Sequence, residues 1–112
     1  MSRIRRLGTE EEDFVAKHLL NLGYTIVTRR YKAPHGEVDI IALDGETLVF
    51  VEVRSRSNGL ISPEESVTAK KADHFRQAVE HYFHQTGQPN VPARYDLVAI
   101  DQNGLRHHKN AL

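Results

Sequence analysis

The sequence predicts an α/β fold in which a mixed sheet of short strands is covered by helices. Two segments have apolar residues at a helical period, and at least four have the short apolar runs typical of strands. They follow the order helix, three strands, helix, then one or two strands, which indicates an α/β sandwich. A chain of 112 residues can bury one core, so we expect a single domain over residues 1–112.

Composition and charge exclude several classes of protein. The 15 Lys and Arg residues balance 15 Asp and Glu residues, so net charge gives no basic signal for nucleic-acid binding. The sequence has no cysteine, which excludes disulfide scaffolds, zinc ribbons and thiol nucleophiles. Its longest apolar runs are far shorter than the roughly 20 residues of a membrane span. Because its start also lacks the apolar stretch of a secretory signal, we expect a cytoplasmic protein with no membrane segment.

The first helix is expected to begin at a cap on Thr9 and to run to about Leu22. Acidic residues fall in its first turn, where the helix dipole favours them, and Gly23 stands at the expected stop. On a wheel at about 100° per residue, Glu12 falls inside the apolar stripe. One carboxylate is therefore expected to face the core.

The second helix is expected from a capping box, Ser-Pro-Glu-Glu at residues 62–65, to about His84. Lys71 lies inside its apolar stripe, so a cation is expected to face the same core. The members of that stripe are Val67, Phe75, Ala78, Val79 and Tyr82.

Strands are expected over residues 24–30, 37–43, 48–55 and 95–101, with a short fifth strand after Gly104. A two-residue turn at Asp44-Gly45 would join the second and third strands and pair Leu43 with Glu46.

Continuing that register places several charged side chains on one side of the sheet. Asp39 would stand opposite Phe50 and diagonal to Glu52, at about 7 to 8 Å, and Arg54 would share their face. A three-residue turn would instead put Asp39 and Glu52 on opposite sides. Two carboxylates removed from water repel each other unless one takes up a proton or a positive group lies between them. A proton or a positive group is therefore expected beside Asp39 and Glu52.

One explanation is a hard divalent cation, Mg²⁺ or Mn²⁺. Asp39 and Glu52 would hold it, helped by the backbone carbonyl of Val53 and by Glu12 through water, because such ions prefer oxygen ligands. A cation of this kind activates water and neutralises charge on a phosphoryl group.

In that explanation Arg54 and Lys71 orient the water or clamp the phosphate. The alternative is a buried salt-bridge network without a metal, in which Glu12 and Glu52 pair with Arg54 and Lys71. Convergence of these charges from three separate elements favours the metal.

Four sequence blocks, in their order and spacing, resemble the YraN-like family of small bacterial proteins. They are GEVDIIA at 36–42, LVFVEVRSR at 48–56, VTAKK at 67–71 and RYD at 94–96, and the resemblance covers nearly the whole chain. The family is assigned to the PD-(D/E)XK nuclease superfamily, which includes Holliday junction resolvases. The resemblance therefore implies a restriction-endonuclease-like αβββαβ core with a mixed central sheet flanked by helices.

The resemblance also implies a Mg²⁺- or Mn²⁺-dependent endonuclease that acts on DNA, with branched DNA such as Holliday junctions among its substrates. Carried over to this sequence, the superfamily's acids and bases fall on residues that the helix wheels and the hairpin had already singled out. They are Asp39 and Glu52 for the metal, Arg54 at the lysine position, Glu12 for the helical acid and Lys71 for the second-helix lysine.

Three positions depart from the superfamily pattern. Val38 stands where the motif's name has proline, and Glu11 replaces a glycine that often precedes the helical acid. Arg54 matters most, because a guanidinium stays protonated and cannot act as a general base, although it can hold a phosphate. If Lys71 does not reach the site, a catalytically weak or inactive nucleic-acid-binding or partner-binding module becomes the better interpretation.

Further basic and polar residues are candidates for DNA backbone contacts, and the alternatives for them are an unstructured terminus and ordinary loop chemistry. A two-fold homodimer would suit a junction substrate with symmetric arms. The candidate contact residues are Arg3, Arg5 and Arg6 near the start and Arg56 and Asn58 in the loop after the third strand.

Overall fold

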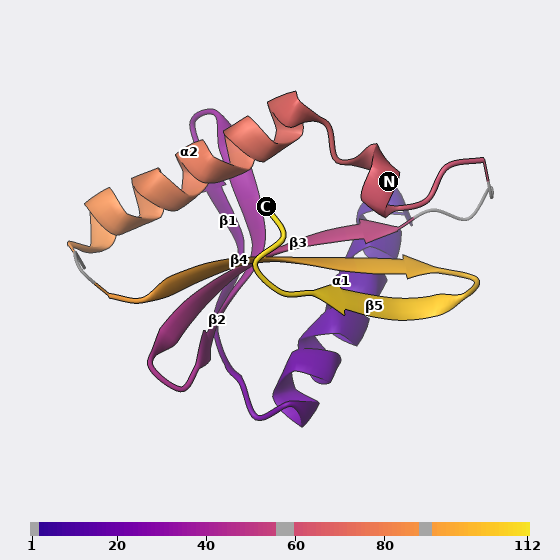
Figure 1. The fold of residues 1–112 in the computed structure, drawn as a ribbon, viewed down its shortest axis with the longest axis horizontal. Coiled ribbons are helices and arrows are strands. Elements are labelled where there is room, and N and C mark those ends of the chain that lie inside the picture. The colour runs from indigo at the N-terminus through magenta and orange to yellow at the C-terminus, as the bar shows by residue number, and fades with distance from the viewer. Residues whose placement is uncertain (1–2, 56–59, 88–90) are drawn as a thin grey trace.

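A computed structural model describes residues 3–55, 60–87 and 91–112, with side chains from residue 10 onward. Five strands form one sheet in the order β1-β2-β3-β4-β5 (Figure 1). Strands β3 and β4 are parallel and all other neighbours are antiparallel, so the sheet is mixed as predicted. The elements are α1 (Arg3–Asn21), β1 (Thr25–Ala33), β2 (Gly36–Asp44), β3 (Thr47–Ser55), the 3₁₀ helix η1 (Glu64–Ser66), α2 (Ala69–Thr86), β4 (Ala93–Asp101) and β5 (Gly104–His108).

The two long helices cover opposite faces of the sheet (Figure 1). Successive side chains of a strand point to opposite faces, and Ile40 packs in one core cluster with Val15 of α1, whereas Ile41 packs in the other with Phe75 of α2. The order of elements and the two covered faces confirm the restriction-endonuclease-like α/β core.

Helix α1 begins earlier than the sequence predicted. It starts at Arg3, so Thr9 lies inside the helix and the predicted cap and acidic first turn are wrong. Arginine and leucine are good helix formers, and residues 3–7 contain three arginines and a leucine ahead of Gly8, which the helix tolerates. The predicted end is close, because the helix stops at Asn21 and Gly23 adopts a positive φ of 92°.

The hairpin between β2 and β3 has a register two residues away from the predicted one. Leu43 pairs with Leu48 rather than with Glu46, and the turn is formed by Gly45 and Glu46. Gly45 has φ +63°, which glycine adopts without strain, and the shifted register places apolar residues opposite one another. A shift of two residues leaves every side chain on the same face, so the predicted sharing of faces survives.

The capping box forms, but it opens a different helix. The N–H of Ser62 donates to Glu65 Oε1 at 2.8 Å, and the N–H of Glu65 donates to Ser62 Oγ at 3.2 Å, just before the short helix η1. Helix α2 begins only at Ala69, where the Thr68 hydroxyl accepts the N–H of Lys71 at 3.1 Å. Two separate caps therefore divide what was predicted as one helix.

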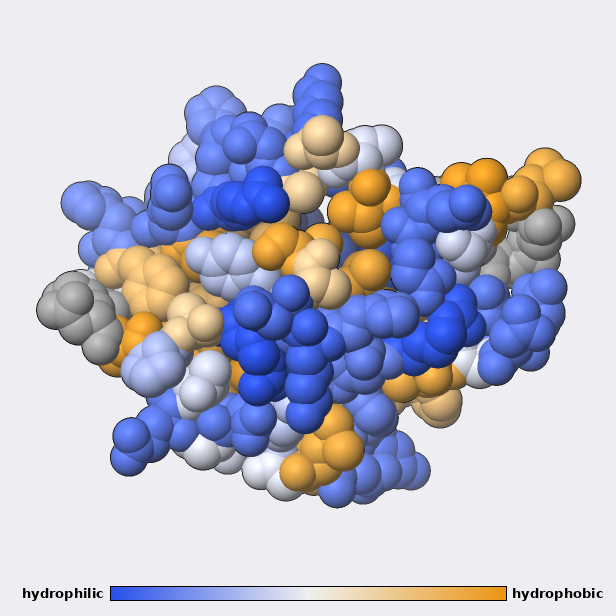
Figure 2. All heavy atoms as spheres, in the orientation of Figure 1, coloured by the Kyte–Doolittle hydropathy of each residue, from blue (hydrophilic) through white to orange (hydrophobic). Residues whose placement is uncertain are grey.

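The surface is consistent with these core assignments. In Figure 2 the outer side of α2, at the upper left, is mostly hydrophilic, as expected of the polar side of an amphipathic helix. Within the described residues, no helix combines the length and the apolar character needed to cross a membrane.

Candidate functional site

A pocket of about 360 Å³ opens where the beginning of α2 crosses the strands β2 and β3. Each of these elements contributes charged groups to it, so residues far apart in the sequence meet here. The lining residues are Gly36, Glu37 and Asp39 from β2, Glu52, Val53 and Arg54 from β3, and Lys71, His74 and Phe75 from α2.

Asp39 and Glu52 lie in this one pocket, as the hairpin argument required. The last pair of the β2–β3 ladder is Ile40 with Val51, and Asp39 and Glu52 are the next residues on the two strands. Asp39 Oδ2 accepts the backbone N–H of Val53 at 2.7 Å, which ties its carboxylate to β3. The two carboxylates therefore lie on the same side of the sheet.

The Asp39 carboxyl group has a strongly raised pKa. Burial is the main cause and the nearby Glu52 carboxylate is the second, and together they outweigh the Val53 N–H and raise the pKa of Asp39 to about 8. Glu12 and Glu37 add smaller repulsions in the same direction. The site therefore favours a positive charge or a proton next to Asp39.

Glu52 is only partly neutralised by its neighbour Arg54. Burial raises the pKa of Glu52, while the charge and hydrogen bond of Arg54 oppose that rise. The contact between Arg54 Nη1 and Glu52 Oε2 is long, 3.4 Å, and the two side chains are 19% and 17% exposed. A shorter bond of 3.0 Å joins Arg54 Nε to the hydroxyl of Ser66, a residue that sequence reasoning missed.

Lys71 reaches the pocket, but from an exposed position. The helix wheel placed Lys71 on the correct face, four residues before the buried Phe75, but the expected burial is wrong, because Lys71 stands in the first turn of α2 and is exposed. Val67 of the same predicted stripe precedes the helix. The Lys71 ammonium donates to the backbone carbonyl of Ser66 at 3.4 Å, and its charge acts on Glu52.

Glu12 is buried, with 8% of its surface exposed, as the helix wheel predicted. Its partners are not the predicted ones, however. Arg30 Nε donates to Glu12 Oε1 at 2.8 Å, and Arg29 Nη2 lies 3.7 Å from the same oxygen while making its closer contact, 2.7 Å, to Asp13. The salt-bridge network with Lys71 and Arg54 is thus wrong for Glu12.

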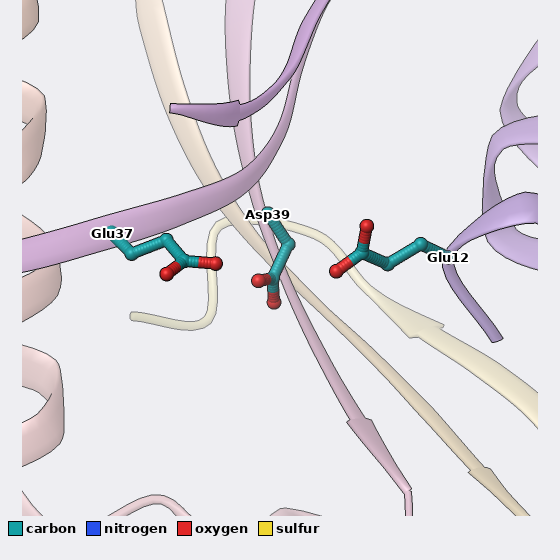
Figure 3. Close-up of side chains that lie close together, drawn as sticks. All are labelled: Glu12, Glu37 and Asp39. Carbon is teal, nitrogen blue, oxygen red and sulfur yellow. The ribbon is translucent and has the colours of Figure 1, made fainter. Parts of the chain in front are cut away.

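Glu37 is a second residue that sequence reasoning missed. One ligand oxygen from each of Glu12, Glu37 and Asp39 lies within 4.8 Å of the others, and Figure 3 shows the three carboxylates turned toward a common space. Glu52 is not in this group. The signal was present in the sequence, because Glu37 and Asp39 are two residues apart on a strand and so share a face.

Gly36 allows α2 to approach the start of β2. A Cβ added at this position would overlap the backbone carbonyl oxygen of His74 and lie 2.8 Å from its carbonyl carbon. Lys71 stands three residues before His74, about one helical turn away. The absence of a side chain at Gly36 therefore helps to set how close Lys71 comes to the acids.

Asp96, on β4, belongs to a separate network on the α1 side of the sheet. It accepts hydrogen bonds from Arg94 Nε at 3.0 Å, from the backbone N–H of Asn110 at 2.9 Å, and it contacts His107 Nε2 at 2.8 Å. His18 of α1 contacts His107 in turn. These contacts satisfy the buried carboxylate of Asp96.

The predicted nucleic-acid contacts fall outside what the structure describes. Arg56 and Asn58 are not among the described residues. Arg3, Arg5 and Arg6 belong to helix α1, but their side chains lie outside the description. These contacts stay predictions.

Fold and site together define the class of protein. It is an α/β protein with the element order of the restriction-endonuclease-like core, with clustered acids and two cations around one pocket. Sequence comparison then gives the family.

The chain belongs to the uncharacterised protein family UPF0102, whose model matches residues 11–100, and this confirms the YraN-like resemblance. A UPF0102 protein of Carboxydothermus hydrogenoformans is 38% identical over 113 residues, covering 96% of each chain. Another, from Desulfitobacterium hafniense strain Y51, is 42% identical over 103 residues, covering 88% of this chain and 85% of its own. One from Persephonella marina is 39% identical over 105 residues, covering 93% and 90%.

Proposed function

We propose that this protein is a metal-dependent DNA endonuclease that hydrolyses phosphodiester bonds, with branched DNA among its substrates. The observation that carries the proposal is the pairing of Asp39 and Glu52 in one pocket, both with raised pKa values. Folding alone gives no reason to bring two such carboxylates together, whereas a cation between them removes their repulsion.

The donor atoms of the pocket fit a hard divalent cation. Asp39, Glu52 and the carbonyl of Val53 would hold Mg²⁺ or Mn²⁺, since all three offer oxygen and neither cysteine nor histidine is needed. Such an ion, when bound, supplies an activated water and positive charge beside the phosphoryl group. Glu12 and Glu37 would orient its waters from the outer side of Asp39.

The two cationic side chains of the pocket, Arg54 and Lys71, would bind the phosphate group of the DNA. Arg54 would bind a non-bridging phosphate oxygen through its guanidinium group, because it cannot accept a proton from water. Lys71, on the exposed side, would contact the phosphate from the direction of solvent. Binding of DNA would thus place the phosphodiester between acids and bases.

The test is cleavage of labelled linear, nicked and four-way DNA by the purified chain with Mg²⁺ or Mn²⁺. We expect wild type to cut at least one of these substrates, with activity lost in EDTA. Glu52→Gln and Asp39→Asn should each lower cleavage by a factor of about 100 or more.

The matched control is Glu46→Gln, which makes the same chemical change at an exposed position in the β2–β3 turn. Its cleavage should equal that of wild type. The proposal fails if wild type cuts no substrate under any condition, or if Glu52→Gln cuts as well as wild type.

A second candidate is a DNA-binding module that has the nuclease fold but no turnover. The observation in its favour is Arg54, which stands at the lysine position and is bonded to Glu52 and Ser66. This reading predicts that Asp39→Asn retains DNA affinity and that EDTA leaves affinity unchanged. Electrophoretic mobility shifts with and without metal distinguish it from the enzyme.

A further inference from the structure

We propose that Ser66 is the positioning residue of this site, because it orients both cations that face Glu52. The inference rests on the proposed function to the extent that it gives those cations a task. Ser66 is 5% exposed and closes the short helix η1, between the loop that follows β3 and the start of α2. It is not among the residues that line the pocket.

The hydroxyl of Ser66 has a fixed orientation. It donates its hydrogen to the backbone carbonyl of Pro63, and its N–H donates to the same carbonyl at 3.1 Å. A hydroxyl group has one hydrogen and two lone pairs, so the bond to Pro63 leaves the lone pairs facing Arg54. Arg54 Nε donates to this oxygen at 3.0 Å.

This bond controls the plane of the Arg54 guanidinium group. The only other described partner of that group is Glu52, whose Oε2 lies 3.4 Å from Nη1, at the long limit of a hydrogen bond. A guanidinium group held at Nε and at one terminal nitrogen cannot rotate freely. Without Ser66, Arg54 would keep only its weaker contact.

Lys71 meets the same residue from the helix side. Its ammonium donates to the backbone carbonyl of Ser66 at 3.4 Å. Ser66 therefore accepts a hydrogen bond from Arg54 of β3 through its side chain and one from Lys71 of α2 through its backbone carbonyl. The separation of Arg54 and Lys71 depends on where Ser66 lies.

The position of Ser66 is itself fixed from the far side of η1. Glu64, two residues earlier, accepts Arg106 Nε at 2.8 Å and Nη2 at 3.0 Å, and it contacts His108 Nε2 at 2.8 Å. Strand β5 thus holds the short helix against the sheet. Cations prepositioned in this way need no ordering when a phosphate arrives, which favours the charged transition state.

The first experiment measures the contact without relying on activity. In a nitrogen-15 NMR spectrum, the Arg54 Nε–H signal of wild type should exchange slowly with water. Ser66→Ala should accelerate that exchange about tenfold or more, since the accepting oxygen is gone, and Ser66→Thr should restore it. An unchanged signal in Ser66→Ala would overturn the proposal.

The second experiment asks whether Ser66 acts through Arg54. We expect Ser66→Ala to lower kcat for DNA cleavage about tenfold with little change in KM, and to have no further effect in an Arg54→Met background. Equal losses in both backgrounds would show a purely structural role and refute positioning. If Ser66→Ala does not fold, Ser66→Cys replaces it, because sulfur is a similar size and a weak acceptor.

The two experiments separate failure of this inference from failure of the proposed function. If wild type cleaves nothing, the endonuclease proposal falls. Altered Arg54 exchange in Ser66→Ala would still support the positioning contact, whereas unchanged exchange would refute it in an active or an inactive protein.

Discussion

The buried Asp96 of β4 and the partly buried Asp39 of β2 have opposite electrostatic character. Asp96 on β4 is fully buried, and burial raises its pKa, but hydrogen bonds from His107, Arg94 and the Asn110 N–H outweigh this and hold that pKa at about 2. Asp39 on β2 accepts the backbone N–H of Val53, but burial and nearby acids raise its pKa to about 8. The fold therefore provides enough hydrogen-bond donors to stabilise the ionised form of one buried carboxylate, Asp96.

The charges around Asp39 oppose one another, in contrast to those around Asp96. A network such as that of Asp96 gains stability from its ionised form, whereas ionised Asp39 and Glu52 repel one another. If stability were the only requirement, Asp39 and Glu52 would each have a cationic partner or would be replaced by uncharged residues. The cation proposed above would give them a reason to be adjacent, and this contrast can be tested.

The largest change in stability is expected on substitution of Asp96, the carboxylate whose hydrogen bonds are all made within the protein. Asp96→Asn should destabilise the protein by about 3 to 5 kcal/mol, because Arg94, with a side chain only 19% exposed, loses its main ionic partner. Urea unfolding at pH 7 measures this. Asp44→Asn, which removes the more exposed partner of Arg94, is the control and should cost much less.

The pH dependence of the same network has a definite sign. The pKa of Asp96 is depressed in the folded state, so its contribution is present above the unfolded pKa of about 4 and is lost as the pH falls toward about 2. Asp96→Asn should flatten the stability curve in this range. A wild-type stability that stays constant from pH 5 to pH 2 would contradict the contrast.

The second effect should have the opposite sign. Asp39→Asn should stabilise the metal-free protein by about 2 kcal/mol at pH 7, because folding otherwise requires Asp39 to take up a proton. With a pKa near 4 unfolded and about 8 folded, Asp39 makes wild-type stability fall as pH rises through that interval. The variant should lack this decline.

Melting curves in EDTA and in Mn²⁺ measure this effect and add a control. Mn²⁺ should raise the melting temperature of wild type but not that of Asp39→Asn, since the variant loses a ligand. A lower melting temperature for Asp39→Asn in EDTA would mean that the carboxylate is structural, and the comparison with Asp96 would break down.

The third effect concerns how helix α2 is placed over the pocket. Gly36→Ala should destabilise the protein by about 1 to 3 kcal/mol, because the new methyl group overlaps the His74 carbonyl and forces α2 away. Cleavage should fall about tenfold or more as Lys71 moves with the helix. Unfolding and single-turnover cleavage are measured together.

Gly45→Ala is the matched control for this prediction. It strains the backbone at φ +63°, yet no atom lies within 4 Å of the added Cβ. It should therefore lower stability but leave cleavage unchanged in conditions where the protein is folded. Equal losses of cleavage in both variants would show that Gly36 acts through stability alone.

Periodicity in the sequence was enough to predict the fold and the shared face of the acids. Side-chain alternation made Asp39 and Glu52 neighbours even though the hairpin register was wrong by two residues, because an even shift leaves the faces unchanged. The buried position of Glu12 followed from the helix wheel in the same way. Their chemical roles stay predictions.

What sequence reasoning missed depends on tertiary contacts or on helix boundaries. The wheel gave Lys71 the helix face of Phe75, but it could not show that Lys71 stands in the first turn of α2, after the Thr68 cap, and is exposed there. The bonds from Arg30 to Glu12 and from Arg54 to Ser66 join different elements, and no local pattern encodes them. Such contacts require the packed structure.

The smallest effect is expected at His18, at the edge of the Asp96 network. Burial lowers the pKa of His18, and the neighbouring His107 lowers it further, so folding favours the neutral ring. The contribution of His18 to the free energy of unfolding should be fully present above the pKa of about 6.5 that histidine has in the unfolded chain. It should decline by about 1 kcal/mol or less as the pH falls below that value. His18→Gln, which retains an N–H donor for His107, should remove that decline. His84→Gln, at an exposed position of α2, should retain it, and a decline unchanged by His18→Gln would place its origin elsewhere.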